Sequence, residues 1–178
     1  MRLFIAINFN TDTRSRLLAL RDELCGKSQR GNFSSPENLH LTLAFIGEVN
    51  PKKVEPIKAI MDTVTFAPFP ATIDRLGTFS RGTLWWAGLR EDKPLMDLQR
   101  EAEHKLALCG FEMDDRKYNP HITLGREVVT DVKPWAIEPF GETVGTIDLM
   151  KSECIGGKLV YTAIYTTKSS GISTNRED

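Results

Sequence analysis

The chain has 178 residues, of which 40% are hydrophobic and 26% are charged, and its formal net charge is −1. This length and composition suit one globular domain or two small fused lobes. So little net charge excludes the broad basic surface with which proteins bind many phosphates, so any contact with nucleic acid is expected to be local. Three widely spaced cysteines without a C-x-x-C pair exclude a disulfide framework or zinc knuckle and favour a reducing cytoplasm.

The first ten residues, MRLFIAINFN, predict a β-strand. Asn8 and Asn10 interrupt the apolar run, and the charged sequence TDTRSR follows without a small-residue cleavage site, so a signal peptide is not indicated. No segment approaches the roughly 20 apolar residues that cross a bilayer. The sequence therefore predicts a soluble cytoplasmic protein with no membrane partner.

Three later segments repeat apolar residues at helical spacing, and residues that start or stop helices bound them. The first follows a cap region at Thr11 and Thr13. Asn50, with a proline after it, predicts the start of the second helix, and Pro94 starts the third, which Gly110 ends. The apolar positions are, in chain order, Leu17, Leu20, Leu24 and Cys25; Val54, Ile57, Met61 and Val64; and Leu95, Leu98, Ala102 and Leu106.

Strand-like runs separate these helices and predict a mixed α and β fold. They lie at 39–46, 70–77, 83–89, 120–124, 142–150 and 158–167. No glycine-rich dinucleotide motif or P-loop is present. The polar end KSSGISTNRED predicts a flexible tail at 168–178 after a single domain at 1–167.

Two of the three histidines begin the same short motif, His-x-Thr-Leu. It occurs in LHLTLAFIG at 39–47 and in PHITLGR at 120–126. Since side chains alternate between the faces of a strand, the leucines of each motif are expected in a core, with the histidine and threonine on the opposite face. The same alternation assigns Phe45 to the core. The third histidine, His104, lies off the apolar face of its helix and is expected to be an exposed surface residue.

Two imidazoles that face each other suit acid and base catalysis at phosphorus. One ring can activate water while the other protonates the departing oxygen, and threonine hydroxyls can donate to the phosphoryl oxygens. A single histidine on a strand is more often structural, but repetition of the motif argues against that interpretation. Zinc binding is the competing interpretation, and neither motif supplies a third ligand. No metal or other cofactor is expected.

The motifs and their surroundings resemble the 2H phosphoesterase superfamily, named for two H-x-[ST] motifs. Within it they are similar to the RNA 2′,3′-cyclic phosphodiesterase group, also called the LigT-like or 2′-5′ RNA ligase family. The resemblance rests on RLFIAINF near the start, ENLHLTLAFIGEV at 37–49 and KYNPHITLGRE at 117–127. It covers the chain up to about residue 167.

This resemblance implies an α+β fold with two lobes, two antiparallel β-sheets with outer helices, a pseudo-two-fold axis and an active-site cleft between the lobes. It implies a phosphoric diester hydrolase that opens a 2′,3′-cyclic phosphate at an RNA 3′ end to a 2′-phosphate. His40 would be the proton donor and His121 the proton acceptor. Thr42 and Thr123 would hold the phosphate, and Arg126 is similar to a basic residue often found at its position.

The expected partners are RNA ends with a cyclic phosphate, such as tRNA halves, and no protein partner is implied. Trp85, Trp86 and Tyr118 are candidates for stacking on a base. Because Trp85 and Trp86 are adjacent on a strand, they must point in opposite directions. Three alternatives stay open: a non-catalytic RNA- or nucleotide-binding module, reversible 2′-5′ RNA ligation, and hydrolysis of a small substrate such as ADP-ribose cyclic phosphate.

Overall fold

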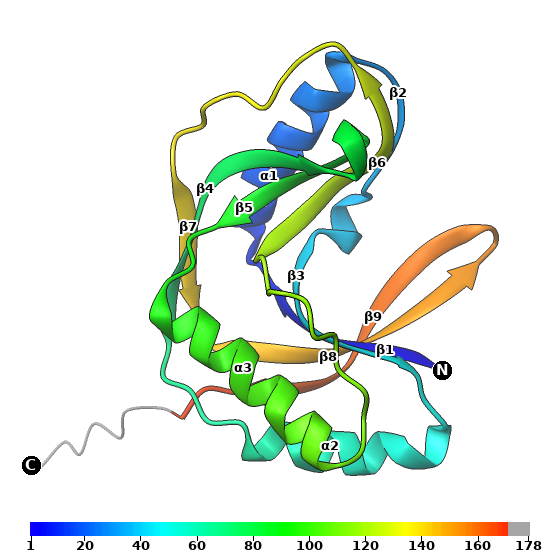
Figure 1. Cartoon of the computed structure of the whole chain (residues 1–178), viewed down its shortest axis with the longest axis vertical. Coiled ribbons are helices and arrows are strands. Elements are labelled where there is room, and N and C mark those ends of the chain that lie inside the picture. The colour runs from blue at the N-terminus through cyan, green and yellow to red at the C-terminus, as the bar shows by residue number, and fades with distance from the viewer. Residues whose placement is uncertain (171–178) are drawn as a thin grey trace, which may run out of the picture.

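The computed structural model describes residues 1–170 and contains two antiparallel sheets, each with its own helices (Figure 1). The first sheet has the strand order β3 (His40–Glu48), β1 (Arg2–Asn8), β8 (Thr146–Ile155) and β9 (Lys158–Lys168). The second has the order β2 (Ser28–Phe33), β6 (His121–Thr130), β5 (Leu84–Leu89), β4 (Phe69–Phe79) and β7 (Phe140–Val144). The predicted α+β fold with two antiparallel sheets is confirmed.

Helices cover one face of each sheet (Figure 1). Helix α1 (Thr11–Gly26) packs on β2, β6 and β7 of the second sheet. Helices α2 (Val54–Thr63) and α3 (Lys93–Leu108) pack on the first sheet through β9 and β3 respectively. Leucine, isoleucine and other apolar side chains from both sheets and all three helices form one core cluster. The helices therefore leave the opposite face of each sheet for the polar motif residues.

All three predicted helices are present, but two begin differently from the prediction. The cap of α1 is Asn10, whose side-chain oxygen accepts a hydrogen bond from the Thr13 backbone N–H at 2.9 Å. Asn50 caps a short 3-10 turn, Pro51–Lys53, before α2 begins. Among the described residues, 1–170, no helix is long and apolar enough to cross a membrane.

The strands differ from the prediction in several places. Strand β6 continues to Thr130 and β8 to Ile155, beyond the predicted ends at residues 124 and 150. Strand β2 was not predicted, because its sequence SQRGNF has no apolar alternation and it lies at the edge of its sheet, paired only with β6. The segment predicted as one strand at 142–150 is divided at Gly145 between β7 and β8, which belong to different sheets. The chain passes from one sheet to the other at this residue.

A bulge in β3 shows that the assignment of Phe45 to the core was wrong. Ala6 of β1 pairs with Thr42, but the next residue back along β1, Ile5, pairs with Ala44, so Leu43 is the extra residue. Leu43 and Ala44 are therefore both buried, and the alternation is reversed beyond them. As a result, the Phe45 side chain is 47% exposed on the same face as His40 and Thr42.

The C-terminal segment is paired beyond residue 167. Strand β9 extends through Lys168, and the Ser169 backbone N–H donates to the Gly145 carbonyl at 2.8 Å. The Ser170 backbone N–H donates to the Phe66 carbonyl at 3.0 Å. The rest of the predicted tail, 171–178, lies outside the described residues.

Substitution of Gly141 tests the close packing of β7 on β4. A Cβ atom at Gly141 would lie 1.8 Å from the Ala71 carbonyl oxygen. Relief of this overlap requires movement of the backbone, so Gly141→Ala should lower the free energy of unfolding by about 1–3 kcal/mol in urea titrations. Gly26→Ala is the matched control, because its Cβ would meet nothing within 4 Å at the end of α1. Equal stability of the two variants would contradict the prediction.

Candidate active site

The two predicted histidines begin two strands of different sheets, β3 and β6. In the first motif Leu41 and Leu43 are buried, and in the second Ile122 and Leu124 are fully buried. The histidine and threonine of each motif are half-buried on the opposite face. The alternation predicted from the sequence is therefore confirmed over both four-residue motifs.

A backbone carbonyl fixes the orientation of each imidazole. His40 Nδ1 lies 2.7 Å from the Asn38 carbonyl oxygen, and His121 Nδ1 lies 2.7 Å from the Asn119 carbonyl oxygen. Because a carbonyl only accepts, Nδ1 carries the proton in both rings. The nitrogen that gains and loses a proton is therefore Nε2. These asparagines were not among the predicted site residues, although both motifs read Asn-x-His-x-Thr-Leu.

The two Nε2 atoms differ in their contacts. His40 Nε2 lies 3.0 Å from the Thr42 hydroxyl, which donates to the neutral ring. Within residues 1–170, His121 Nε2 has no hydrogen-bond partner, and the Thr123 hydroxyl makes no bond to it. The second imidazole is therefore free to accept a proton from an incoming molecule.

Aromatic side chains surround each imidazole. The Tyr161 ring meets His40 edge-on, and the Phe79 ring meets His121 edge-on, each with centroids 5.1 Å apart and planes at 89°. Phe4 lies 5.0 Å from His40, and Trp86 lies 6.2 Å from His121. These rings reduce the contact of the imidazoles with water. They come from β1, β4, β5 and β9, so no local motif could have identified them together.

The electrostatic environment favours the neutral form of both imidazoles. Burial lowers the pKa of His40, and the positive charges of His121 and Arg126 lower it further. The hydrogen bond to the Asn38 carbonyl raises this pKa and opposes part of the decrease. Burial likewise lowers the pKa of His121, with Arg126 adding to the effect and the bond to Asn119 opposing it. The two motifs lie close together in space, because β3 and β6 contact each other and the Tyr118 hydroxyl, just before β6, bonds to the Thr42 carbonyl of β3 at 2.8 Å.

Arg126 reaches the motif face through a second bulge. Trp86 of β5 pairs with Thr123, and Trp85 pairs with Gly125, so Leu124 is the extra residue. This places Arg126 on the same face as His121 and Thr123, where its side chain is exposed. Its position after the second motif is equivalent to that of Phe45 after the first.

The three aromatic candidates for base stacking occupy different environments. Trp85 is 2% exposed in the core, and Trp86 lies on the opposite face beside His121, as adjacent strand residues must. Trp86 is itself only 8% exposed, so burial leaves neither indole free as a stacking surface. Burial raises the pKa of Tyr118, and the Tyr118 hydroxyl donates to the Thr42 carbonyl at 2.8 Å. Tyr118 thus joins the loop before β6 to the first motif.

The remaining candidates lie apart from this site. His104 is exposed on α3, as predicted. Among residues 1–170, no group of three or more His, Cys, Asp or Glu side chains has the arrangement of a metal site.

Comparison with known proteins identifies the family. The family described as LigT like Phosphoesterase matches residues 7–86 and 88–153. The chain belongs to the LigT-like phosphoesterase family. It is 34% identical over 151 residues to the RNA 2′,3′-cyclic phosphodiesterase of Archaeoglobus fulgidus, covering 80% of this chain and 85% of that protein. It is 31% identical over 127 residues to the protein of the same name from Escherichia coli, covering 71% and 72%.

Solved structures of LigT have the same fold. The crystal structure of Escherichia coli LigT complexed with 3′-AMP aligns with a TM-score of 0.84 and 27% identity, over 96% of this chain and 98% of that one. A crystal structure described as a phosphoesterase aligns equally well, with a TM-score of 0.84 and 26% identity. The family assignment made from the two motifs is confirmed, and the LigT-like chain is a phosphoesterase.

The lowered histidine pKa values predict how the stability of this LigT-like phosphoesterase depends on pH. Because folding favours the neutral imidazoles, the unfolded chain takes up protons first as the pH falls below its ordinary histidine pKa, near 6.5. The contribution of the two histidines to the free energy of unfolding is therefore fully present above that pH. It decreases as the pH falls toward the pKa values of the folded protein. A His40→Gln, His121→Gln double variant should lose less stability than wild type between about pH 7.5 and 5 in urea titrations. An equal loss in both proteins would refute this origin.

Proposed function

We propose that this phosphoesterase opens the 2′,3′-cyclic phosphate at an RNA 3′ end to a 2′-phosphate, with His40 and His121 as its acid and base and without a metal ion. One observation carries the proposal: the two imidazoles begin strands of different sheets that contact each other, β3 and β6, and carbonyls hold both Nδ1 atoms so that Nε2 is the nitrogen that exchanges protons. The names of the curated relatives support the substrate. The two threonines beside the imidazoles support a phosphate ligand.

In the proposed reaction, His121 Nε2 accepts a proton from a water molecule whose oxygen attacks phosphorus. The bond between phosphorus and the 3′ oxygen breaks, and His40 Nε2–H protonates that oxygen. The product is a 2′-phosphate and a 3′-hydroxyl, and the proton gained by His121 returns to solvent as His40 is reprotonated. The absence of a hydrogen bond to His121 Nε2 within residues 1–170 supports its assignment as the base.

The neighbouring polar groups supply the remaining functions of the proposed site. Thr42 and Thr123 donate their hydroxyl protons to the non-bridging phosphoryl oxygens, where negative charge increases in the transition state. Arg126 lies on the same face of β6 as His121 and Thr123 and is exposed, so its guanidinium can pair with a phosphate bound beside them.

The terminal nucleoside has a candidate surface at the far end of both motifs. Phe45 and Arg126 hold equivalent positions beyond the two bulges, and both are exposed. Phe45 already carries the Arg2 guanidinium over its ring, 5.0 Å from the centroid. Stacking on an aromatic ring and on a guanidinium is a common way to bind an unpaired base. In this proposal Trp86 packs against His121 rather than against the base.

The broader assignments follow from the same proposal. Joining of RNA ends through a 2′-5′ linkage would use the same acid and base in reverse, by microscopic reversibility. Residues 1–167 would act as one domain, since the motifs belong to different sheets. The cytoplasm is the proposed location, and the exposed, free states of Cys25, Cys109 and Cys154 agree with a reducing compartment.

Histidine substitution tests the catalytic assignment. With an oligoribonucleotide that ends in a 2′,3′-cyclic phosphate and with excess EDTA, His40→Ala and His121→Ala should each lower kcat by about 10²–10⁴-fold. His104→Ala is the matched control and should retain wild-type turnover, because His104 is exposed on α3. Loss of wild-type activity in EDTA, or full activity of either motif variant, would overturn the proposed mechanism.

The lowered pKa values also set the pH dependence of turnover. The profile of kcat/KM reports the acid and base of the free enzyme, and burial lowers the pKa of both. The kcat/KM profile should therefore be bell-shaped, with its maximum below the ordinary histidine pKa of about 6.5. A bound phosphate anion stabilises both imidazolium forms, so the maximum of kcat should lie at higher pH. Coincident maxima would contradict this account.

A further inference from the structure

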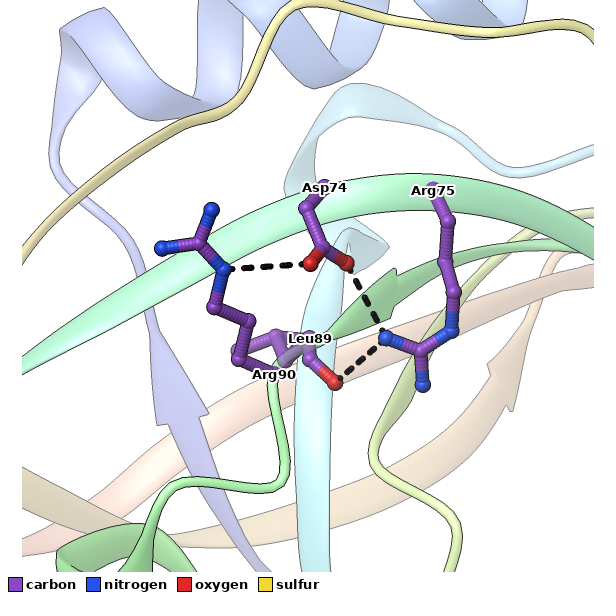
Figure 2. A network of polar contacts seen from close by, with 4 residues as sticks. All are labelled: Asp74, Arg75, Leu89 and Arg90. Carbon is purple, nitrogen blue, oxygen red and sulfur yellow. Dashed lines mark hydrogen bonds and ion pairs between the residues drawn. The ribbon is translucent and has the colours of Figure 1, made fainter.

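Two arginines and one aspartate form a network on the second sheet (Figure 2). Asp74 accepts from Arg75 Nη1 at 3.0 Å through one carboxylate oxygen and from Arg90 Nε at 3.1 Å through the other. Arg75 Nη1 also donates to the Leu89 carbonyl at 3.0 Å. One carboxylate thus orients two guanidinium groups, and the network keeps one net positive charge.

The network lies on the same face of the sheet as His121. Gly88 of β5 pairs with His121 on one side and with Arg75 of β4 on the other. The Cα atoms of Arg75 and His121 are therefore two strand spacings, or about 10 Å, apart. The Arg75 guanidinium also lies over Trp86, 5.9 Å from its ring, and Trp86 contacts His121.

A glycine between the two strands gives the guanidinium this position. A Cβ atom at Gly88 would lie 2.9 Å from Arg75 Cγ and 3.0 Å from Arg75 Cζ. Because Gly88 has no side chain, Arg75 extends over β5 toward the strand that carries His121. Alternation along the chain from Trp86 through Gly88 places Arg90 on this face as well.

The network has donors and accessible surface left for a ligand. Within residues 1–170, Nε and Nη2 of Arg75 and both Nη atoms of Arg90 make no hydrogen bond. The exposed fractions of the side chains are 38% for Arg75 and 49% for Arg90, against 24% for Asp74. The arginines are therefore more accessible than the carboxylate that orients them. Fixed guanidinium groups with free N–H donors suit a phosphate ligand.

We propose that Arg75 and Arg90 bind the phosphodiester that precedes the terminal nucleotide of the RNA. This inference rests on the proposed function, because it places the cyclic phosphate beside His121. Arg75 lies two strands across the sheet from His121 and level with it, whereas Arg126 lies farther along β6, beyond Thr123, so the two cationic groups lie on different sides of the reaction site. A terminal nucleoside held near Arg126 leaves the Arg75 side for its 5′ phosphate. The site would thereby favour an RNA end over a mononucleoside cyclic phosphate.

Two substrates and two variants test this subsite. Uridine 2′,3′-cyclic phosphate lacks the second phosphate, and diuridine 2′,3′-cyclic phosphate contains it. For Arg75→Gln and Arg90→Gln, kcat/KM on the dinucleotide should fall by about tenfold, as expected for loss of a charge-assisted hydrogen bond, with little change on the mononucleotide. Arg30→Gln is the matched control, because Arg30 is an exposed arginine on β2 of the same sheet.

A neutral linkage gives a test that requires no substitution in the protein. The dinucleotide is made with an uncharged methylphosphonate between its nucleosides and a 2′-O-methyl group on the first nucleoside, with the 2′-O-methyl phosphodiester as reference. The neutral linkage should lower wild-type kcat/KM about as much as Arg75→Gln does, and it should cause little further loss in that variant.

The outcomes separate this inference from the proposed function. Equal wild-type turnover of the charged and neutral linkages, or equal losses on both uridine substrates in the arginine variants, would overturn the subsite and leave the proposed function intact. Failure of wild type to open either cyclic phosphate would overturn both. A selective loss on the charged dinucleotide supports the subsite even where a variant is less stable, because the mononucleotide measures the active fraction.

Discussion

Burial of the two apolar residues in each motif is the constraint on which the site depends. The buried residues are Leu41 and Leu43 in one sheet and Ile122 and Leu124 in the other. Their burial forces the histidine and threonine of each motif onto the opposite face of the strand. A slip of one residue would bury an imidazole and expose a leucine, which is costly in both respects. The hydrophobic core therefore determines the direction of the polar groups as well as the stability of the strands.

The second constraint is the way each strand departs from regular pairing. A carbonyl two residues before each histidine holds Nδ1, and a bulge lies at the leucine of each His-x-Thr-Leu motif. The carbonyl leaves Nε2 as the nitrogen that exchanges protons. The bulge turns the side chain two residues after the leucine, Phe45 or Arg126, toward the motif face. Because the same two features occur in both sheets, the two halves present matched imidazoles but different end groups, Phe45 and Arg126. That difference suits a ligand whose two ends are chemically unlike.

The sequence alone predicted the structure correctly where it depends on interactions between residues close together in the chain. Alternation within the motifs predicted their core and polar faces correctly, and apolar spacing predicted most of the buried helix positions. Cys25, which was placed on the apolar face of α1, is exposed. Phe45 was assigned wrongly because a bulge depends on the pairing with β1, which the sequence of β3 alone does not specify. Strand β2 is mostly polar at a sheet edge and gave no pattern to detect.

Other parts of the site depend on contacts between distant segments. Tyr161 and Phe79 reach the imidazoles from strands that no motif marks. The position of Arg75 depends on the register of three strands and on one glycine. Such residues can be assigned to the site only when the pairing of the strands is known. The asparagines before the histidines are the exception, since their repetition was present in the sequence.

Under the proposed function, the charge distribution explains how a chain with a net charge of −1 could act on RNA. Its relevant cations are few and lie around the two imidazoles, and burial lowers the pKa of each imidazole. In the proposed site, a phosphate would meet the guanidinium charges, and its own negative charge would favour protonation of an imidazole. Binding and activation are thus linked: under the proposed reaction, the acid is formed in the presence of the group on which it acts. Recognition of this kind needs a phosphate at the end of the strand and no extended basic surface.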